Sequence, residues 1–358
     1  MKLFFELISI SVGNIQKFDI SPNEQEWEAI FKIAQKQAIL GILFDGIEKL
    51  PNDQRPPKQL ILQWFSIVSQ IERKNQLLNV RCSQVTERFL VDNIQTCVLK
   101  GQGNAMLYPN RLRRQSGDID IWVDMRPKDA ISYVKKHCKN WTELRYHHIA
   151  MPLKDVMVEV HFRPAFMDSF VRNHRFQKWA AAAKPIQMQN YSEKDIDKSF
   201  HVPTTEFNLI YQLVHIFRHL FDEGIGLRQL IDYYYLLKSV NPDNEHLKQQ
   251  TVVVLKKLGL RKFAGAMMWV MGNLMGLDKK HMYLEPNEKE GRFLLDEVMM
   301  AGNFGKYDPR FGDLTGESTW HHFWRKIKRN MRFLKSYPEE VISEPFFRIY
   351  HWGWRLFA

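Results

Sequence analysis

Residues 113–124 read RRQSGDIDIWVD, an alternation of acidic and apolar side chains that predicts a half-buried β-strand. Side chains along a strand point to alternate faces, so Ile119, Ile121 and Val123 share one face while Asp118 and Asp120 share the other. Two carboxylates held this close repel each other and are costly to leave unpaired in a cleft. A divalent cation, a pair of basic side chains or plain solvent could each relieve that repulsion.

A second stretch, VMVEVHF at residues 156–162, repeats the alternation and puts Glu159 and His161 on its polar face. It follows HHIAMPL across Lys154 and Asp155, which predicts a β-hairpin. If this strand lies beside the first one, Glu159 becomes a third carboxylate of the same group. Three such acids can hold Mg²⁺ ions, which prefer oxygen ligands and complete their shells with substrate phosphates. Paired ions of this kind can activate an attacking hydroxyl and stabilise leaving pyrophosphate.

Helical patterns flank this central block on both sides. Residues 24–49 carry apolar side chains at helical spacing, and residues 58–92 predict one long amphipathic helix. The middle of the chain then alternates as β-α-β-α-β-β, with helices interleaved among strands. From residue 206 onward the pattern is helical again.

Composition describes a globular chain of 358 residues, with 45% apolar and 25% charged residues. No apolar run approaches the roughly 20 residues that a membrane span needs, and Glu6 interrupts the apolar N-terminus, which predicts a first helix and no signal peptide. Cys82, Cys97 and Cys138 are irregularly spaced, which argues against a disulfide framework or a cysteine-rich zinc site and favours a reducing cytoplasm. The net charge of +11 suggests an anionic partner such as a nucleotide, a nucleic acid, an acidic glycan or a membrane surface. A role in solubility explains the charge equally well. No specific motif supports nucleic acid as the partner.

The stretch VLKGQGNAMLYPNRLRRQSGDIDIWVD resembles the nucleotidyltransferase-fold superfamily and, within it, the bacterial family of uncharacterised nucleotidyltransferases. The positions that match the family pattern are Lys100, Gly101, Tyr108, Pro109, Arg114, Gly117, Asp118, Asp120, Glu159 and His161. A second stretch, LVHIFRHLFDEGIGLRQLIDYYYLL, is similar to the helical region of that family, with His215, His219, Arg228 and Asp232 matching. The resemblance extends from about residue 25 to about residue 275.

The resemblance implies an α+β fold with a small mixed β-sheet. Its nucleotidyltransferase catalytic core is expected over residues 95–200, between helical regions at 1–94 and 201–358. The implied activity is the Mg²⁺- or Mn²⁺-dependent transfer of a nucleoside monophosphate from an NTP, such as ATP, to an unidentified small or macromolecular acceptor.

The resemblance also implies a role for each matching residue. Asp118, Asp120 and Glu159 would be the catalytic metal ligands, with Glu159 or Asp120 also deprotonating the acceptor hydroxyl. The nucleotide-binding residues would be Lys100, Gly101, Gly103, Arg114 and His161, and the residues of the acceptor site or cleft would be His215, Arg228 and Asp232.

Two positions depart from the superfamily pattern. Gln102 stands where Ser or Gly is usual, and Glu159 stands where Asp is frequent. Gln102 favours an alternative: a non-catalytic protein that binds a nucleotide or another anion on a degenerate transferase fold. The intact set of three acids favours the enzyme.

Several motifs have more ordinary interpretations. The adjacent histidines at 147–148 lack a cysteine or a third histidine at ligand spacing, which argues against zinc. His215 and His219 share one helix face and predict a buried pair or a cleft wall. Arg228 and Asp232 have the spacing of a helix ion pair and could also line a cleft.

The tail from residue 320 to residue 358 mixes Lys and Arg with Trp, Phe and Tyr. This composition fits peripheral contact with a membrane surface or a partner. It equally fits helices that pack their aromatic side chains on the body of the protein and turn their cations to solvent.

Overall fold

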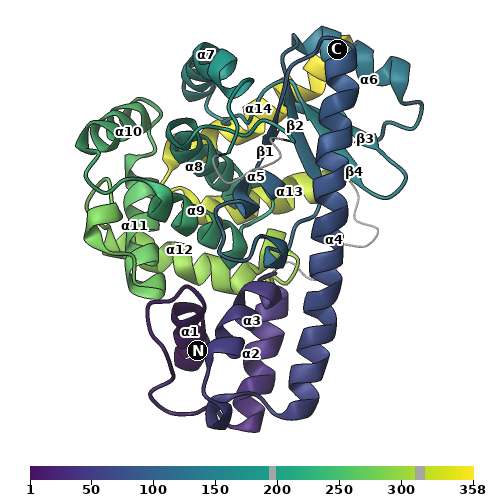
Figure 1. The fold of residues 1–358 in the computed structure, drawn as a ribbon. Coiled ribbons are helices and arrows are strands. Elements are labelled where there is room, and N and C mark those ends of the chain that lie inside the picture. Colours follow the sequence, from purple (N-terminus) through teal and green to yellow (C-terminus); the bar gives the residue numbers. More distant parts are fainter. Residues whose placement is uncertain (193–198, 311–318) are drawn as a thin grey trace.

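A small β-sheet lies among helices from both ends of the chain in the computed structural model (Figure 1). The model describes the backbone of residues 1–192, 199–310 and 319–358, and the side chains of these residues except 319–322. The fold is α+β, as the resemblance implies.

The sheet has four strands in the order β1-β2-β4-β3, which are β1 (Thr96–Leu99), β2 (Ile119–Val123), β4 (Met157–His161) and β3 (His148–Pro152). β2 runs parallel to β4, and the other two neighbouring pairs are antiparallel, so the sheet is mixed. The expected hairpin is formed by β3 and β4, and the expected pairing of the two acid-bearing strands is formed by β2 and β4. In the β2–β4 register Asp120 lies opposite Glu159.

The N-terminal helices are α1 (Lys2–Ser11), α2 (Glu24–Lys36), α3 (Leu40–Lys49) and α4 (Lys58–Val91). A capping box at Asn23 starts α2, and the positive φ of 55° at Ala38 separates α2 from α3. The single long helix predicted over 58–92 is confirmed as α4. Its second half packs Leu78, Cys82 and Val85 against the sheet, so this helix connects the N-terminal region to the strands.

The remaining helices within the described residues are α5 (Gly101–Ala105), α6 (Pro127–His137), α7 (Phe170–Gln187), α8 (Thr205–Asp222), α9 (Leu227–Ser239), α10 (Glu245–Lys257), α11 (Arg261–Met275), α12 (Glu288–Ala301), α13 (Thr319–Asn330) and α14 (Pro338–Phe357). Short 3-10 helices are η1 (Asn52–Gln54), η2 (Arg111–Arg113), η3 (Lys279–His281), η4 (Asn303–Gly305) and η5 (Met331–Phe333). The sequence pattern did not predict α7, because its buried positions include the amides Asn173 and Gln187 and form no apolar stripe.

Both faces of β2 are buried. Ile119, Ile121 and Val123 belong to a hydrophobic cluster with α4 and α6. On the opposite face Trp122 stacks on Phe207 of α8, with ring centroids 5.5 Å apart. Asp120 of β2, and Asp118 just before the strand, are on the face of Trp122, which is covered by helices.

Membrane-spanning helices are absent from the described part of the chain, where no helix is both long and apolar enough to cross a bilayer.

Candidate active site

A cavity of about 230 Å³ lies between the sheet and helices α8 and α9. The predicted site residues that line it are Lys100, Gly101, Arg114, Asp118, Asp120, Glu159, His215, Arg228 and Asp232. The sheet, the turn after β1 and the two helices therefore bring together residues that are more than 100 positions apart in the sequence.

The three carboxylates meet at one wall of this cavity. The parallel register places Asp120 opposite Glu159, and Asp118 precedes Asp120 by two residues. Burial, and then the neighbouring charge of Asp120, raise the pKa of Asp118. The pKa of Glu159 is also raised, because burial and the two aspartates outweigh its hydrogen bond with His161.

Asp120 is held by two basic side chains. The Nζ of Lys100 lies 2.5 Å and the Nε2 of His161 lies 2.9 Å from Asp120 Oδ1. Burial favours the neutral carboxyl, but Lys100 and His161 together hold the pKa of Asp120 well below its usual range. Asp120 is therefore ionised.

His161 is fully buried and does not line the cavity directly. Its ring also contacts Glu159 Oε2 at 3.3 Å and the carbonyl of Arg163 at 3.3 Å. Burial lowers the pKa of His161, but the hydrogen bonds to Asp120 and Glu159 outweigh burial and raise it. As an imidazolium, His161 donates hydrogen bonds to these acceptors and fixes both carboxylates in place.

The turn from β1 into α5 is strained where it faces the carboxylates. Lys100 has a positive φ of 50°, which is uncommon for a residue with a Cβ, and Gly101 has a φ of 30°. Gly103 has a packing role, since a Cβ at this position would lie 3.0 Å from the carbonyl oxygen of Val98. Gly103 therefore lets α5 approach β1 and is not part of the cavity lining.

Gln102 turns away from the cavity. Its side chain is buried against α4, where Nε2 donates to Asn79 Oδ1 at 2.5 Å. Gln102, which departs from the superfamily pattern, therefore does not occupy the space in front of the carboxylates.

A buried ion pair also lines the cavity. Arg114 donates from Nε and Nη2 to the two oxygens of Asp232, both at 2.7 Å, and Tyr108 donates to Asp232 at 2.6 Å. Arg228 donates to the carbonyl of Gln115 at 2.5 Å. Among the described contacts, Asp232 thus pairs with Arg114 and not with Arg228, its neighbour on the helix.

Replacing Asp232 by Asn is expected to lower the free energy of unfolding by about 3 kcal/mol, because Arg114 would remain buried without its counter-charge. The measurement is urea denaturation of the full chain. Asp129→Asn is the matched control: it breaks an exposed ion pair with Arg126, which solvent screens, so it should cost much less stability than Asp232→Asn. Equal losses for the two variants would contradict a structural role for the buried pair.

A group of histidines lies beside the carboxylates. The ring centroids of His147 and His148 lie 5.2 Å and 5.0 Å from that of His161. Ring nitrogens of the three histidines lie within 4.8 Å of one another, as do ligand atoms of Asp120, Glu159 and His161. From the sequence, no third histidine was expected near residues 147–148. That expectation is wrong, because His161 on the neighbouring strand lies close to both.

The histidines around His161 are neutral, in contrast to His161 itself. Burial holds the pKa of His147 and His148 well below the usual range, and neighbouring basic groups lower it further. His215 and His219 on α8 have ring centroids 4.4 Å apart and line the cavity, and burial lowers their pKa as well.

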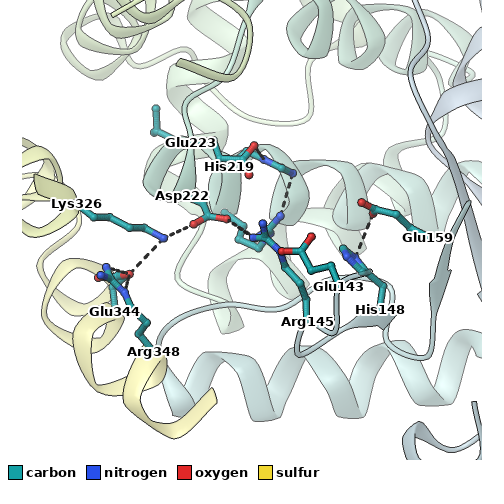
Figure 2. A network of polar contacts seen from close by, with 12 residues as sticks. Glu143, Arg145, His148, Glu159, His219, Asp222, Glu223, Lys326, Glu344 and Arg348 are labelled. Atoms are coloured by element: carbon teal, nitrogen blue, oxygen red, sulfur yellow. Dashed lines mark hydrogen bonds and ion pairs between the residues drawn. The ribbon is translucent and has the colours of Figure 1, made fainter. Parts of the chain in front are cut away.

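The cavity is also lined by residues that the sequence did not single out, namely Asn104, Glu143, Arg145, Gln212, Arg218, Glu223, Gln229 and Phe304. Figure 2 shows how a polar network continues from this wall toward the C-terminal helices. Asp222 accepts from Arg218 at 3.0 Å and from Arg145 at 3.4 Å, and it pairs with Lys326 of α13. The C-terminal helices are therefore joined to the site by ion pairs.

The small mixed sheet thus brings three carboxylates to face a strained lysine-glycine turn, in one cavity. A family model described as uncharacterised nucleotidyltransferase matches residues 23–276, which is more than half of the 358 residues, and the chain belongs to that family. A comparison with curated proteins finds no match.

Proposed function

We propose that this protein transfers a nucleoside monophosphate from an NTP to a hydroxyl or phosphate acceptor, with release of pyrophosphate and dependence on Mg²⁺ or Mn²⁺. The observation that supports this most strongly is the convergence of Asp118, Asp120 and Glu159 on one cavity within a nucleotidyltransferase-family chain.

The three carboxylates fit a divalent cation. They are oxygen ligands of the kind Mg²⁺ and Mn²⁺ prefer. Asp118 and Glu159 also have raised pKa values, caused by burial and by their mutual repulsion with Asp120, which a cation would relieve. When bound, the metal would act as a Lewis acid that neutralises charge on the phosphates and on the leaving pyrophosphate.

Glu159 is the better candidate for the base that accepts the proton of the acceptor hydroxyl. A useful general base has a pKa near the working pH. The pKa of Glu159 is raised, whereas Lys100 and His161 keep Asp120 ionised and weakly basic. His161 would orient both carboxylates during the reaction.

The remaining residues would position the two substrates. Lys100 faces the carboxylates from the strained turn and would contact the triphosphate. Arg114 is hydrogen-bonded to Asp232, so only part of its guanidinium would be available to contact a phosphate. His215 and Arg228 line the helical side of the cavity and would border the acceptor, with Asp232 shaping that wall.

Calorimetry with the four NTPs tests the proposal. At least one NTP should bind in the presence of Mg²⁺ or Mn²⁺, and EDTA should weaken its binding strongly. Pyrophosphate release by the same NTP should then appear with a suitable acceptor. Failure of every NTP to bind, with and without metal, would contradict the proposed function.

Replacing Lys100 by Met is expected to weaken NTP binding roughly tenfold, the size of one charge-assisted hydrogen bond, and to leave nucleoside binding nearly unchanged. Lys184→Met is a suitable control, because Lys184 also pairs with an aspartate near the sheet, Asp124, but does not line the cavity. If the substitution weakened the binding of nucleoside and NTP equally, the assignment of Lys100 as a phosphate contact would be contradicted.

A further inference from the structure

Helix α14 buries two glutamates and leaves a row of large apolar side chains exposed. Glu340 and Glu344 are 0% and 3% exposed, whereas seven large apolar side chains of the helix remain open to solvent. These exposed side chains are Ile342 (57%), Phe346 (62%), Ile349 (61%), Tyr350 (46%), Trp352 (60%), Leu356 (64%) and Phe357 (91%). The tail sequence allowed two arrangements, and the structure contains both: Phe333, Tyr337 and Phe347 pack inward, whereas Phe346, Tyr350, Trp352 and Phe357 are exposed. The side chains of residues 319–322 lie outside the described part.

Specific contacts fix this orientation. Glu340 accepts the backbone N–H of Asp168 at 2.5 Å, and Glu344 pairs with Lys326 at 3.5 Å, as Figure 2 shows for the latter pair. Phe347, on the same inward side, stacks on Phe166 with ring centroids 5.1 Å apart. Turning the helix to hide its apolar side chains would break all three contacts, so the outward face is a stable feature of the fold.

The outward face has the residue order of a helix that lies in a lipid interface. With 3.6 residues per turn, Ile342, Phe346 and Ile349 lie at the centre of the exposed arc, while Tyr350 and Trp352 lie at its two edges. Aromatic residues with a polar atom prefer the boundary between hydrocarbon and water, and an apolar centre prefers hydrocarbon.

The apolar surface extends beyond α14. Phe170, 45% exposed, contacts Tyr350 with ring centroids 5.6 Å apart, and Val171 beside it is 58% exposed. A contiguous apolar surface of this kind is unusual on a protein that has no partner for it.

Basic residues adjoin the last turn of the helix. Lys135 of α6 donates to the carbonyl of Ala358 at 3.4 Å, and Lys136 and Lys139 nearby are exposed. Figure 1 shows the C-terminus beside α6. Lysines next to an interfacial helix attract anionic lipid headgroups.

We infer that the outer face of α14, together with Phe170 and Val171, binds the surface of an anionic lipid bilayer, with the helix lying in the plane of the interface. A bilayer fits this face better than a second copy of the chain does, because each copy carries a net charge of +11 and would bring its lysines toward those of the other. The binding is peripheral, in keeping with the absence of a spanning helix from the described residues. It is independent of the proposed transferase activity.

Vesicle flotation of the full chain tests this inference. The protein should float with vesicles of phosphatidylcholine and phosphatidylglycerol, and much less with phosphatidylcholine alone. Ile349→Glu together with Phe346→Glu should lower the bound fraction about tenfold or more, since burying a carboxylate in hydrocarbon is costly. Lys136→Glu together with Lys139→Glu should lower binding to the anionic vesicles only.

Leu62→Glu is the matched control, because Leu62 is a 59% exposed apolar residue on α4, outside the α14 surface. It should bind vesicles as the wild type does, and all variants should keep the wild-type melting temperature. Failure of the wild-type chain to float, or equal loss with Leu62→Glu, would overturn the inference. So would a lipid-free dimer in analytical ultracentrifugation that the α14 variant converts to a monomer, because a second copy would then be the occupant.

Discussion

Replacing Glu159 by Gln is expected to lower the rate of nucleotidyl transfer about 10³-fold or more, which corresponds to about 4 kcal/mol of lost transition-state stabilisation. The amide keeps the shape of the side chain and its contact with His161, but it carries no charge for a metal and cannot act as a base. Glu159 lies opposite Asp120 in the sheet and completes the group of three carboxylates that line the cavity. The measurement is pyrophosphate release from the NTP that the wild-type protein consumes.

Glu143→Gln is the control for this variant. Glu143 also lines the cavity, but it belongs to the segment before β3 and pairs with Arg145 at 2.7 Å. It should change the rate only a few-fold. Activity of Glu159→Gln within tenfold of wild type, with an unchanged melting temperature, would remove Glu159 from the mechanism.

The second large effect is expected from Asp118→Asn combined with Asp120→Asn, which should abolish metal-dependent NTP binding. Two of the three carboxylates lose their charge, while Lys100 and His161 remain, so the wall of the cavity becomes cationic and repels a metal ion. Isothermal titration calorimetry with Mn²⁺ and the NTP measures the effect.

Removing the charge of Asp120 also leaves two buried basic groups unpaired, so folding is checked by circular dichroism. Asp118→Asn alone, at a half-buried position, gives a second variant that should weaken binding without affecting the fold. Asp124→Asn, just beyond the far end of the same strand, is the control and should bind as the wild type does. Wild-type affinity in the double variant would show that the metal ligands lie elsewhere.

The sheet and its carboxylates could be predicted because the strand patterns are local. Period-two alternation identified both acid-bearing strands, and the shared apolar faces predicted their pairing. The same reasoning could have located the third histidine. In a hairpin that turns at Lys154 and Asp155, paired residue numbers sum to 309, which places His148 opposite His161 and Ala150 opposite Glu159.

The far wall of the cavity was not predictable in the same way. Arg114 and Asp232 are separated by 118 positions, and a charge on a helix gives no sign of which distant partner it meets. Phe304 and Arg218 line the cavity because of how the helices pack together, and local sequence patterns do not indicate which helices will be neighbours in space.

Helix α14 shows a further limit of periodicity. Spacing correctly predicts which side chains share a helix face, but it does not say which face meets the protein. The outcome depends on distant partners: Lys326 pairs with Glu344, and the backbone N–H groups of Asp168 and Ser169 donate hydrogen bonds to Glu340.

Anomalous diffraction from a crystal grown with Mn²⁺ and a non-hydrolysable NTP analogue tests the central claim most directly. The expected result is a manganese peak in the cavity, within coordination distance of carboxylate oxygens of Asp118, Asp120 and Glu159, with phosphate oxygens of the analogue completing its shell. Lys100 should then have moved from Asp120 toward the phosphates. A peak that contacts none of these carboxylates, or a Glu159 side chain turned away from both aspartates in the complex, would contradict the proposed site.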